Sequence, residues 1–233
     1  MHKRLSTIDL ATRRAEMRVS LEQDIVHWCA PVLAAIKPGA MFAYPYTMKS
    51  RAEIRTRHPK VMLFDEFLCA LTRCREQLEP AGVHVTVLAW RENGALLFFH
   101  RPELVKAALA EPLCAQNLQA LGYDPTDFDG SLDELRARIH ACDKLTRPRD
   151  FWDFPHEVGY FLGYPALDVQ AYTRYRGQNC STEGEWRAYG CHRRAHAMQQ
   201  VFARLRACTE SYWQLYLQGT SLADLAALGS LNL

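Results

Sequence analysis

Residues 84–101, HVTVLAWRENGALLFFHR, decide the fold of this chain of 233 residues. Two apolar runs rich in β-branched and aromatic residues, 84–91 and 95–101, flank the tripeptide Glu92-Asn93-Gly94. Asn-Gly between two such runs is the strongest short-range signal for a β-hairpin. Residues 40–46 form the one other convincing strand-like run. The sequence therefore predicts a small antiparallel sheet of about three strands.

Helical patterns precede and follow this hairpin. Ser20 is a candidate cap for a helix whose apolar face includes Ile25, Trp28, Cys29, Val32 and Ile36, and Pro31 predicts a kink in it. A second amphipathic helix is expected at residues 62–78. After Pro102 the pattern is almost entirely helical, at residues 102–110, 112–121, 131–144, 155–162, 165–176, 184–206 and 222–228.

Residues typical of helix termini support the predicted helix boundaries. Gly122, Gly163 and Gly177 stand where helix C-termini need a left-handed residue, and Ser131 with Glu134 predicts a capping box. We therefore expect an α+β fold in which helices cover the sheet and the C-terminal half is mainly helical. Residues 1–19 read as a polar extension, and residues 20–233 as a single domain, because no repeat or linker divides them.

Composition excludes several classes of protein. Nearly half of the residues are apolar (48%), and the formal net charge of +2 is too small to imply a polyanionic partner. The first twenty residues carry no apolar run of a secretory signal, and no run reaches the roughly 20 residues that span a membrane. The sequence predicts a cytoplasmic protein without a membrane partner, in which the eight cysteines are reduced thiols.

The densest cluster of aromatic and polar residues is residues 151–165, FWDFPHEVGYFLGYP. Pro155 suits the first turn of a helix, which would put His156 and Glu157 at its N-terminal end. The helix dipole there lowers the proton affinity of a histidine, so the pair could do acid–base work or hold a ligand. The alternative is structural: Glu157 caps the helix and His156 bonds a neighbouring loop.

Cys29 is a candidate nucleophile because it lies in a helical segment beside His27, Trp28 and Pro31. With His156 as base and Glu157 as orienter, it would make a thiol enzyme. The alternative is a buried, inert thiol.

The sequence patterns that could indicate a metal site or a polyanion-binding site are weaker. Cys180, Cys191, His192 and His196 form the best metal-like grouping, and the two histidines are four apart on one helical face, yet their spacing matches no zinc pattern. Basic residues interleaved with aromatics also follow Arg174, but a solvated helix face is the simpler interpretation, and nucleic-acid binding is disfavoured. Phosphate-binding glycine loops, a nucleophile elbow and a His-Glu-x-x-His motif are missing from the sequence.

Three segments carry a resemblance to a known family: CAPVLAAIKPG at residues 29–39, FPHEVGYFLGYP at 154–165 and GEWRAYG at 184–190. In this order they resemble a bacterial family, the domain of unknown function 3793. The third segment departs from the family pattern Gly-Tyr-Trp-Lys-Val-Tyr, because Glu185, Arg187 and Ala188 replace three positions.

The resemblance brings no established activity. It implies a cytoplasmic protein, commonly of anaerobes, with a hint of iron limitation and flavodoxin-type settings. Carried over by motif, the positions to follow are Cys29, Lys37, Pro38, His156, Glu157, Gly163, Tyr164, Trp186 and Tyr189.

Three hypotheses follow. In the first, Lys37, Tyr164, Trp186 and Tyr189 help to bind a small ligand, an iron species or haem, or a redox protein partner. In the second, Cys29, His156 and Glu157 form a thiol-dependent hydrolase or transferase. In the third, the basic C-terminal helices form an interaction or regulatory module. The identity of any cofactor or metal is left open by the sequence.

Overall fold

The computed structural model describes residues 20–48, 62–144 and 151–230, so the predicted extension at residues 1–19 lies outside the described part of the chain. Its centre is an antiparallel sheet in the order β1-β5-β4, formed by β1 (Gly39–Tyr44), β4 (His84–Arg91) and β5 (Gly94–His100). Arg91 pairs with Gly94 across the two-residue turn Glu92-Asn93. The predicted hairpin and three-stranded sheet are confirmed.

β5 is the central strand and is buried along its whole length. Alternate side chains of a strand point to opposite faces of its sheet. Accordingly, Leu97 and Phe99 join one hydrophobic core while Leu96 and Phe98 join a second core on the other face. The unbroken apolar run that marked this strand in the sequence reflects burial from both sides.

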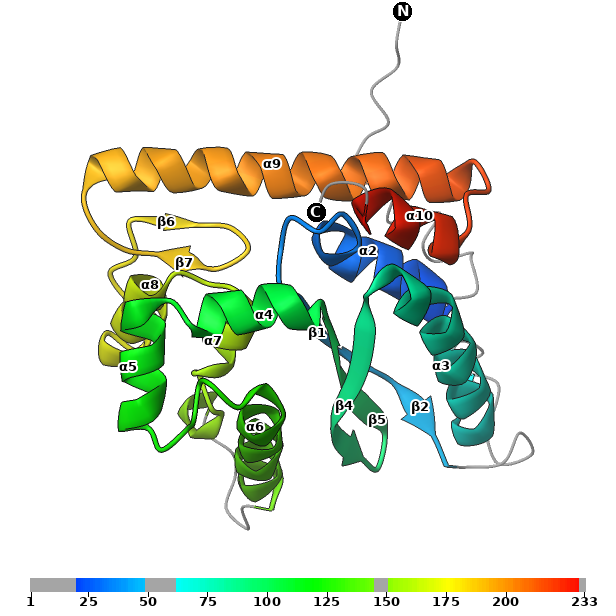
Figure 1. Ribbon diagram of the computed structural model, residues 1–233, viewed down its shortest axis with the longest axis horizontal. Coiled ribbons are helices and arrows are strands. Elements are labelled where there is room, and N and C mark those ends of the chain that lie inside the picture. The colour runs from blue at the N-terminus through cyan, green and yellow to red at the C-terminus, as the bar shows by residue number, and fades with distance from the viewer. Residues whose placement is uncertain (1–19, 49–61, 145–150, 231–233) are drawn as a thin grey trace, which may run out of the picture.

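On the first face lie α2 (Leu21–Leu33), α3 (Phe64–Leu78) and α10 (Leu222–Ser230) (Figure 1). The short 3₁₀ helix η1 (Glu79–Ala81) follows α3, and β2 (Tyr46–Thr47) pairs in parallel with β3 (Met62–Leu63). The predicted cap of α2 is confirmed, because the Ser20 hydroxyl accepts the backbone N–H of Gln23 and the Gln23 side chain accepts the N–H of Ser20.

The second face is covered by a further set of helices. These are α4 (Pro102–Leu109), α5 (Pro112–Ala120), α6 (Phe128–Asp143), the 3₁₀ turn η2 (Phe151–Asp153), α7 (Val158–Phe161) and α8 (Ala166–Arg174). A small hairpin then follows, formed by β6 (Thr182–Glu183) and β7 (Arg187–Ala188).

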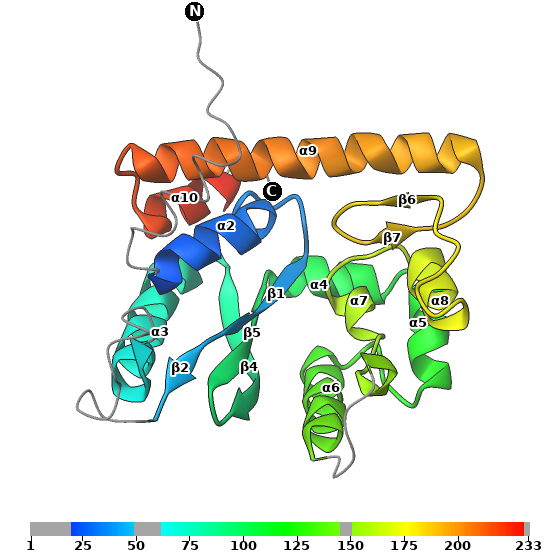
Figure 2. The ribbon, with the colours of Figure 1, turned by 180° about the vertical axis from the view of Figure 1, so that it is seen from behind.

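α9 (His192–Leu217) crosses both halves of the molecule. Figures 1 and 2 show it running from the β6–β7 hairpin at one end to α2 and α10 at the other. Phe202 packs against the hairpin, while Tyr212 belongs to the core beneath α2. The fold is therefore α+β with a helical C-terminal half, as predicted.

Three local predictions were wrong. α6 begins at Phe128 because the Asp127 carboxylate accepts the N–H of Gly130, and Ser131 instead donates its hydroxyl to the Asp124 carbonyl. The helix expected at residues 155–162 is the single turn α7. The helix expected from residue 184 begins only at His192, because residues 184–188 belong to the β6–β7 hairpin and Gly190 has φ +121°. By contrast, the left-handed glycines predicted after α5, α7 and α8 are confirmed.

Arg101 follows β5 and ties the sheet to three helical segments. It is 3% exposed, and its guanidinium donates to the carbonyls of Val32 and Leu33 at 2.8 Å, Ala81 at 2.7 Å and Ala226 at 3.2 Å. The carbonyls of Val32, Leu33 and Ala81 lie at the C-terminal ends of α2 and η1, where the helix dipole favours a cation, and the carbonyl of Ala226 lies within α10.

The first prediction concerns this guanidinium. Arg101→Leu removes all of these buried, charge-assisted hydrogen bonds at once, so the free energy of unfolding should fall by roughly 3 kcal/mol or more. Urea denaturation measures it. Arg136→Leu on the exposed face of α6 is the matched control and should change the value by less than about 0.5 kcal/mol. Equal effects would contradict the role given to Arg101.

A second prediction follows from His100 at the end of β5. Burial, with a smaller effect of the nearby His84, lowers its pKa to about 3. In the unfolded chain histidine titrates near 6.5. As the pH falls below about 6.5, the unfolded state therefore binds a proton that the folded state does not bind, and the free energy of unfolding decreases. We expect a loss of about 2 kcal/mol from His100 between pH 7 and pH 5.

The measurement compares urea denaturation of the unmodified protein and His100→Phe at both pH values. The variant keeps the ring stacked on Phe98 but cannot titrate, so its stability should depend less on pH. His84→Phe, at an exposed position of β4, is the control and should behave as the unmodified protein does. Parallel pH profiles for all three proteins would rule out the contribution from His100.

Candidate functional site

Lys37 is a buried cation in the loop between α2 and β1. Its backbone N–H donates to the Pro31 carbonyl at 3.0 Å, and the residue is 7% exposed. Nζ lies 3.6 Å from Oε2 of Glu185 and 5.1 Å from the ring centroid of Tyr164. Burial lowers the pKa of this ammonium group, and the Glu185 carboxylate acts in the opposite direction.

Glycines let the segment that ends in Tyr164 approach this loop. Gly163 has φ +75°, and a Cβ there would lie 2.5 Å from Cδ of Pro38. A Cβ on Gly39 would lie 2.8 Å from the carbonyl oxygen of Phe161. Two segments that are far apart in sequence and that both carry the family resemblance therefore meet, at Pro38 and Gly163.

Aromatic rings complete the enclosure of Lys37. Tyr164 stacks on Trp186 with centroids 5.0 Å apart and 28° between the rings, and its hydroxyl donates to the backbone carbonyl of Glu185 at 3.2 Å. Trp186 also meets Phe202 of α9 edge-on at 4.7 Å. The structure thus brings together Lys37, Tyr164 and Trp186, three of the four predicted ligand-binding residues.

Asp168 holds Trp186 in place, and sequence reasoning missed it. This carboxylate on α8 is 2% exposed and accepts from Nε1 of Trp186 at 2.9 Å, from the backbone N–H of Tyr189 at 2.9 Å and from both terminal nitrogens of Arg194 at 2.6 and 2.9 Å. Its only sequence signal is a lone acid in an apolar stretch, which cannot reveal a partner 26 residues away. The fourth predicted residue, Tyr189, therefore enters the network through its backbone.

His156 and Glu157 face different neighbours. α7 begins only at Val158, so both residues sit in a turn, and a helix of one turn gives them little dipole. The His156 ring lies edge-on to Trp152 at 4.9 Å and Tyr172 at 5.2 Å, and burial lowers its pKa. Glu157 accepts from the Tyr123 hydroxyl at 3.1 Å and from Arg138 at 3.2 Å.

Cys29 is wholly buried on α2, in the core of the first sheet face. Burial raises the pKa of its thiol far above the ordinary value, and nearby Lys37 only partly opposes this. A nucleophilic cysteine needs the thiolate, which this environment disfavours. Among the described residues no hydrogen bond or ring contact joins Cys29 to His156, so the thiol-enzyme hypothesis stays a prediction without support from this geometry.

Three residues of the predicted metal grouping lie at the start of α9, whereas Cys180 precedes β6. Cys191 precedes the helix, and His192 and His196 are exposed on its first turns. Within residues 20–48, 62–144 and 151–230, no three side chains of His, Cys, Asp or Glu are arranged to hold a metal ion. The same ranges contain no helix long and apolar enough to cross a membrane.

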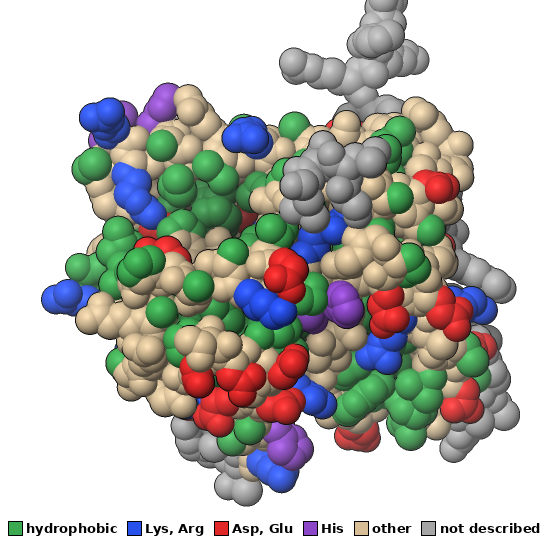
Figure 3. Space-filling model, viewed as in Figure 1, with side chains coloured by type: hydrophobic (Ala, Val, Ile, Leu, Met, Phe, Trp, Pro, Cys, Tyr) green, Lys and Arg blue, Asp and Glu red, His purple; other side chains and the backbone are tan. Residues whose placement is uncertain are grey.

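The basic residues of the C-terminal half divide into two groups. Arg194 is committed to Asp168, and Arg187 pairs with Glu183 at 3.0 Å. Arg193 and Arg204 are exposed on α9, and Figure 3 shows basic and histidine side chains gathered where α9 begins. A solvated face accounts for these side chains, and the interaction-module hypothesis stays a prediction.

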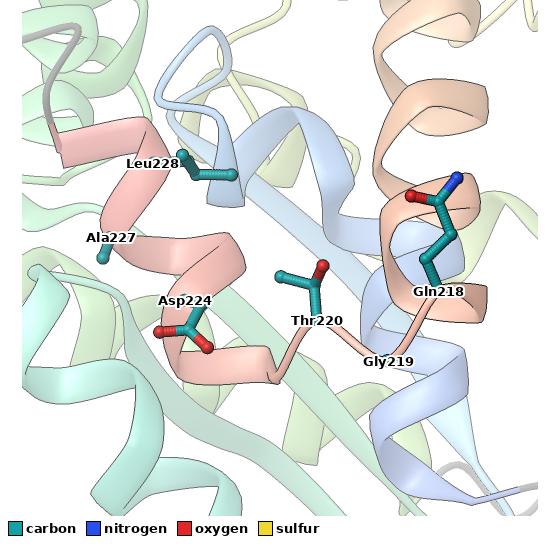
Figure 4. Close-up of a pocket in the computed structure, with 6 residues that line it drawn as sticks. All are labelled: Gln218, Gly219, Thr220, Asp224, Ala227 and Leu228. Carbon is teal, nitrogen blue, oxygen red and sulfur yellow. The ribbon is translucent and has the colours of Figure 1, made fainter.

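Two surface hollows differ in their relation to these residues. One of about 370 Å³ lies between α4–α5 and the α7–α8 segment, with Tyr164 and Gly163 in its wall beside Tyr160, Pro165 and Glu111. A larger one, about 590 Å³, lies at the α9–α10 connection. Figure 4 shows its side chains spread along that connection, and its Asp224 carboxylate already accepts the Ser221 hydroxyl. Only the first adjoins the predicted ligand residues.

Fold and site define an α+β protein in which a buried lysine lies over the ring of Tyr164, which stacks on Trp186 and lines a mostly apolar hollow. Residues 25–226 match the family described as protein of unknown function (DUF3793), which covers most of the chain. The chain belongs to this family. Comparison with curated proteins and with solved structures gave no match.

A third prediction concerns the Asp168 network. Asp168→Ala leaves the Arg194 guanidinium and Nε1 of Trp186 without their acceptor, so the free energy of unfolding should fall by about 3 to 5 kcal/mol. The tryptophan emission should also change. The matched control Asp133→Ala breaks an exposed pair with Arg136 and should cost less than about 0.5 kcal/mol. If Asp168→Ala lowered the free energy of unfolding as little as the control does, the stabilising role of the Asp168 network would be refuted.

Proposed function

We propose that this protein is a cytoplasmic binding protein whose small, planar ligand lies against the Tyr164–Trp186 ring pair and extends into the adjoining hollow. The observation that carries the proposal is the position of Tyr164, which contacts both Lys37 and Trp186 and also lines that hollow. Ligand sites are typically concave and mostly apolar, with a few placed polar groups.

The ring pair is suited to binding because it is both accessible and rigid. Tyr164 and Trp186 are half-buried, so each residue keeps some surface exposed to solvent. Trp186 is fixed by its bond to Asp168 and its edge contact with Phe202. A side chain that is already ordered loses little conformational entropy when a ligand stacks on it.

Haem is one planar ligand that this surface would accept, and a redox protein carrying an aromatic cofactor is a related partner. The link to anaerobic or iron-limited metabolism, with reduced thiols, stays a prediction from the family resemblance. A planar organic group needs only the ring pair and the hollow, so it agrees best with the described residues, which offer no cluster of metal ligands.

The fourth prediction tests this proposal with two planar probes, riboflavin and haemin, on the full chain. Flavin fluorescence polarisation and haem absorbance should each report saturable binding. Trp186→Leu removes the stacking surface and should weaken binding by about tenfold or more. Trp90→Leu changes an exposed tryptophan on β4, far along the chain from the site, and should bind as the unmodified protein does.

Circular dichroism checks that both variants fold, and Tyr164→Leu provides a second loss of the ring pair should Trp186→Leu fail to fold. If the unmodified protein binds neither probe, the proposal is wrong. Equal binding by the Trp186 and Trp90 variants would likewise contradict it, because the probe would then lie elsewhere.

A further inference from the structure

The two partners of the ion pair at the centre of the site differ in their exposure to solvent. The Lys37 side chain is 9% exposed, whereas that of its partner Glu185 is 37% exposed. Lys37 is held from the α2–β1 loop, and Glu185 lies in the turn between β6 and β7. A fixed, enclosed cation therefore faces a carboxylate that water can reach.

This pair is also loose. Nζ and Oε2 are 3.6 Å apart, longer than the roughly 2.7–2.9 Å of a charge-assisted hydrogen bond. In the same network Arg194 approaches Asp168 to 2.6 and 2.9 Å. A buried ammonium group needs a counter-charge, yet among the described residues Glu185 is the only carboxylate within ion-pair distance of Lys37.

The backbone around Glu185 is fixed while its carboxylate is not. The Tyr164 hydroxyl binds its carbonyl, Gly184 N–H donates to the Trp186 carbonyl at 3.1 Å, and Gly184 packs directly on Phe202. The side chain can therefore rotate into water without displacing Trp186. Such a rotation would leave the Lys37 ammonium group facing an unoccupied position beside the two rings.

We propose that the ligand carries an anionic group, a carboxylate or a phosphate, which replaces the Glu185 carboxylate at Lys37, so that Glu185 is an internal competitor for the ligand's place. This inference rests on the proposed binding function and adds the chemical class of the ligand. A lysine ammonium group with three donors binds either kind of anion as a compact charge, and the rings select its planar portion.

The fifth prediction compares two ligands that share one ring system. Flavin mononucleotide carries a phosphate that riboflavin lacks, so the unmodified protein should bind it about tenfold more tightly, one charge-assisted hydrogen bond corresponding to about 1.5–3 kcal/mol. Glu185→Gln removes the competitor and should tighten flavin mononucleotide binding further, roughly threefold or more, with riboflavin unchanged. Lys37→Met should abolish the difference between the two ligands.

Glu183→Gln is the matched control, because it removes an exposed carboxylate of the same hairpin that pairs with Arg187 instead of Lys37. It should leave the affinity ratio of the two flavins unchanged. An equal gain for Glu183→Gln and Glu185→Gln would mean that only the overall charge of the hairpin matters, and the competitor role would be wrong.

A second measurement needs no planar ligand. Sodium phosphate and sodium acetate, at constant ionic strength, should raise the thermal midpoint of Glu185→Gln by several degrees more than that of Glu183→Gln. The anion that acts at lower concentration identifies the class. Adding Lys37→Met to Glu185→Gln should remove the response.

The two experiments separate the two proposals. Riboflavin binding that depends on Trp186, with no preference for flavin mononucleotide and no anion response, would overturn the anion inference and leave the binding function standing. An anion response through Lys37 without binding of either flavin or haemin would overturn the planar-ligand function and support the anion subsite.

Discussion

The buried guanidinium of Arg101 joins the central sheet to three helical segments at once. Its donors bind carbonyls of α2, η1 and α10 and so hold these three segments to the end of β5. Its backbone N–H also donates to the Pro38 carbonyl at 2.9 Å. The loop that carries Lys37 is therefore fixed by the same residue that fixes the sheet, and the position of the site depends on that contact.

A second buried ionic contact organises the opposite wall of the site. Asp168 gathers Arg194 from α9, the Trp186 indole and the Tyr189 backbone, all from segments that follow it in the chain. Because the carboxylate is almost inaccessible to water, each of these donors is needed to satisfy it. The pair between Lys37 and Glu185 is different, since one partner is exposed and the distance is long. The hydrogen bonds of Arg101 and Asp168 thus hold the two sides of the site in place, whereas the proposed exchange of an anion needs the longer Lys37–Glu185 pair.

The candidate residues chosen from the sequence fall into two groups in the structure: those that meet at the site, and those that have other neighbours. Lys37, Tyr164 and Trp186 meet because Gly163 permits Pro38 to pack directly on its backbone. Glu157 accepts hydrogen bonds from Tyr123 and Arg138, whereas Cys29 is buried in the core of the first sheet face. Glu185 was noted only as a departure from the family pattern, although it is the partner of the buried lysine.

The sequence by itself determined the elements whose signals are local. The Asn-Gly turn with its flanking apolar runs determined the hairpin, the capping residue Ser20 marked the start of α2, and glycines marked the ends of three helices. Only the packing of the whole chain explains that residues 184–188 belong to a hairpin, beside which Asp168 binds the backbone of Tyr189, and that Lys37 is buried. Turns and caps are stabilised by groups a few residues apart, whereas the burial of a charge depends on partners brought together only when the whole chain packs.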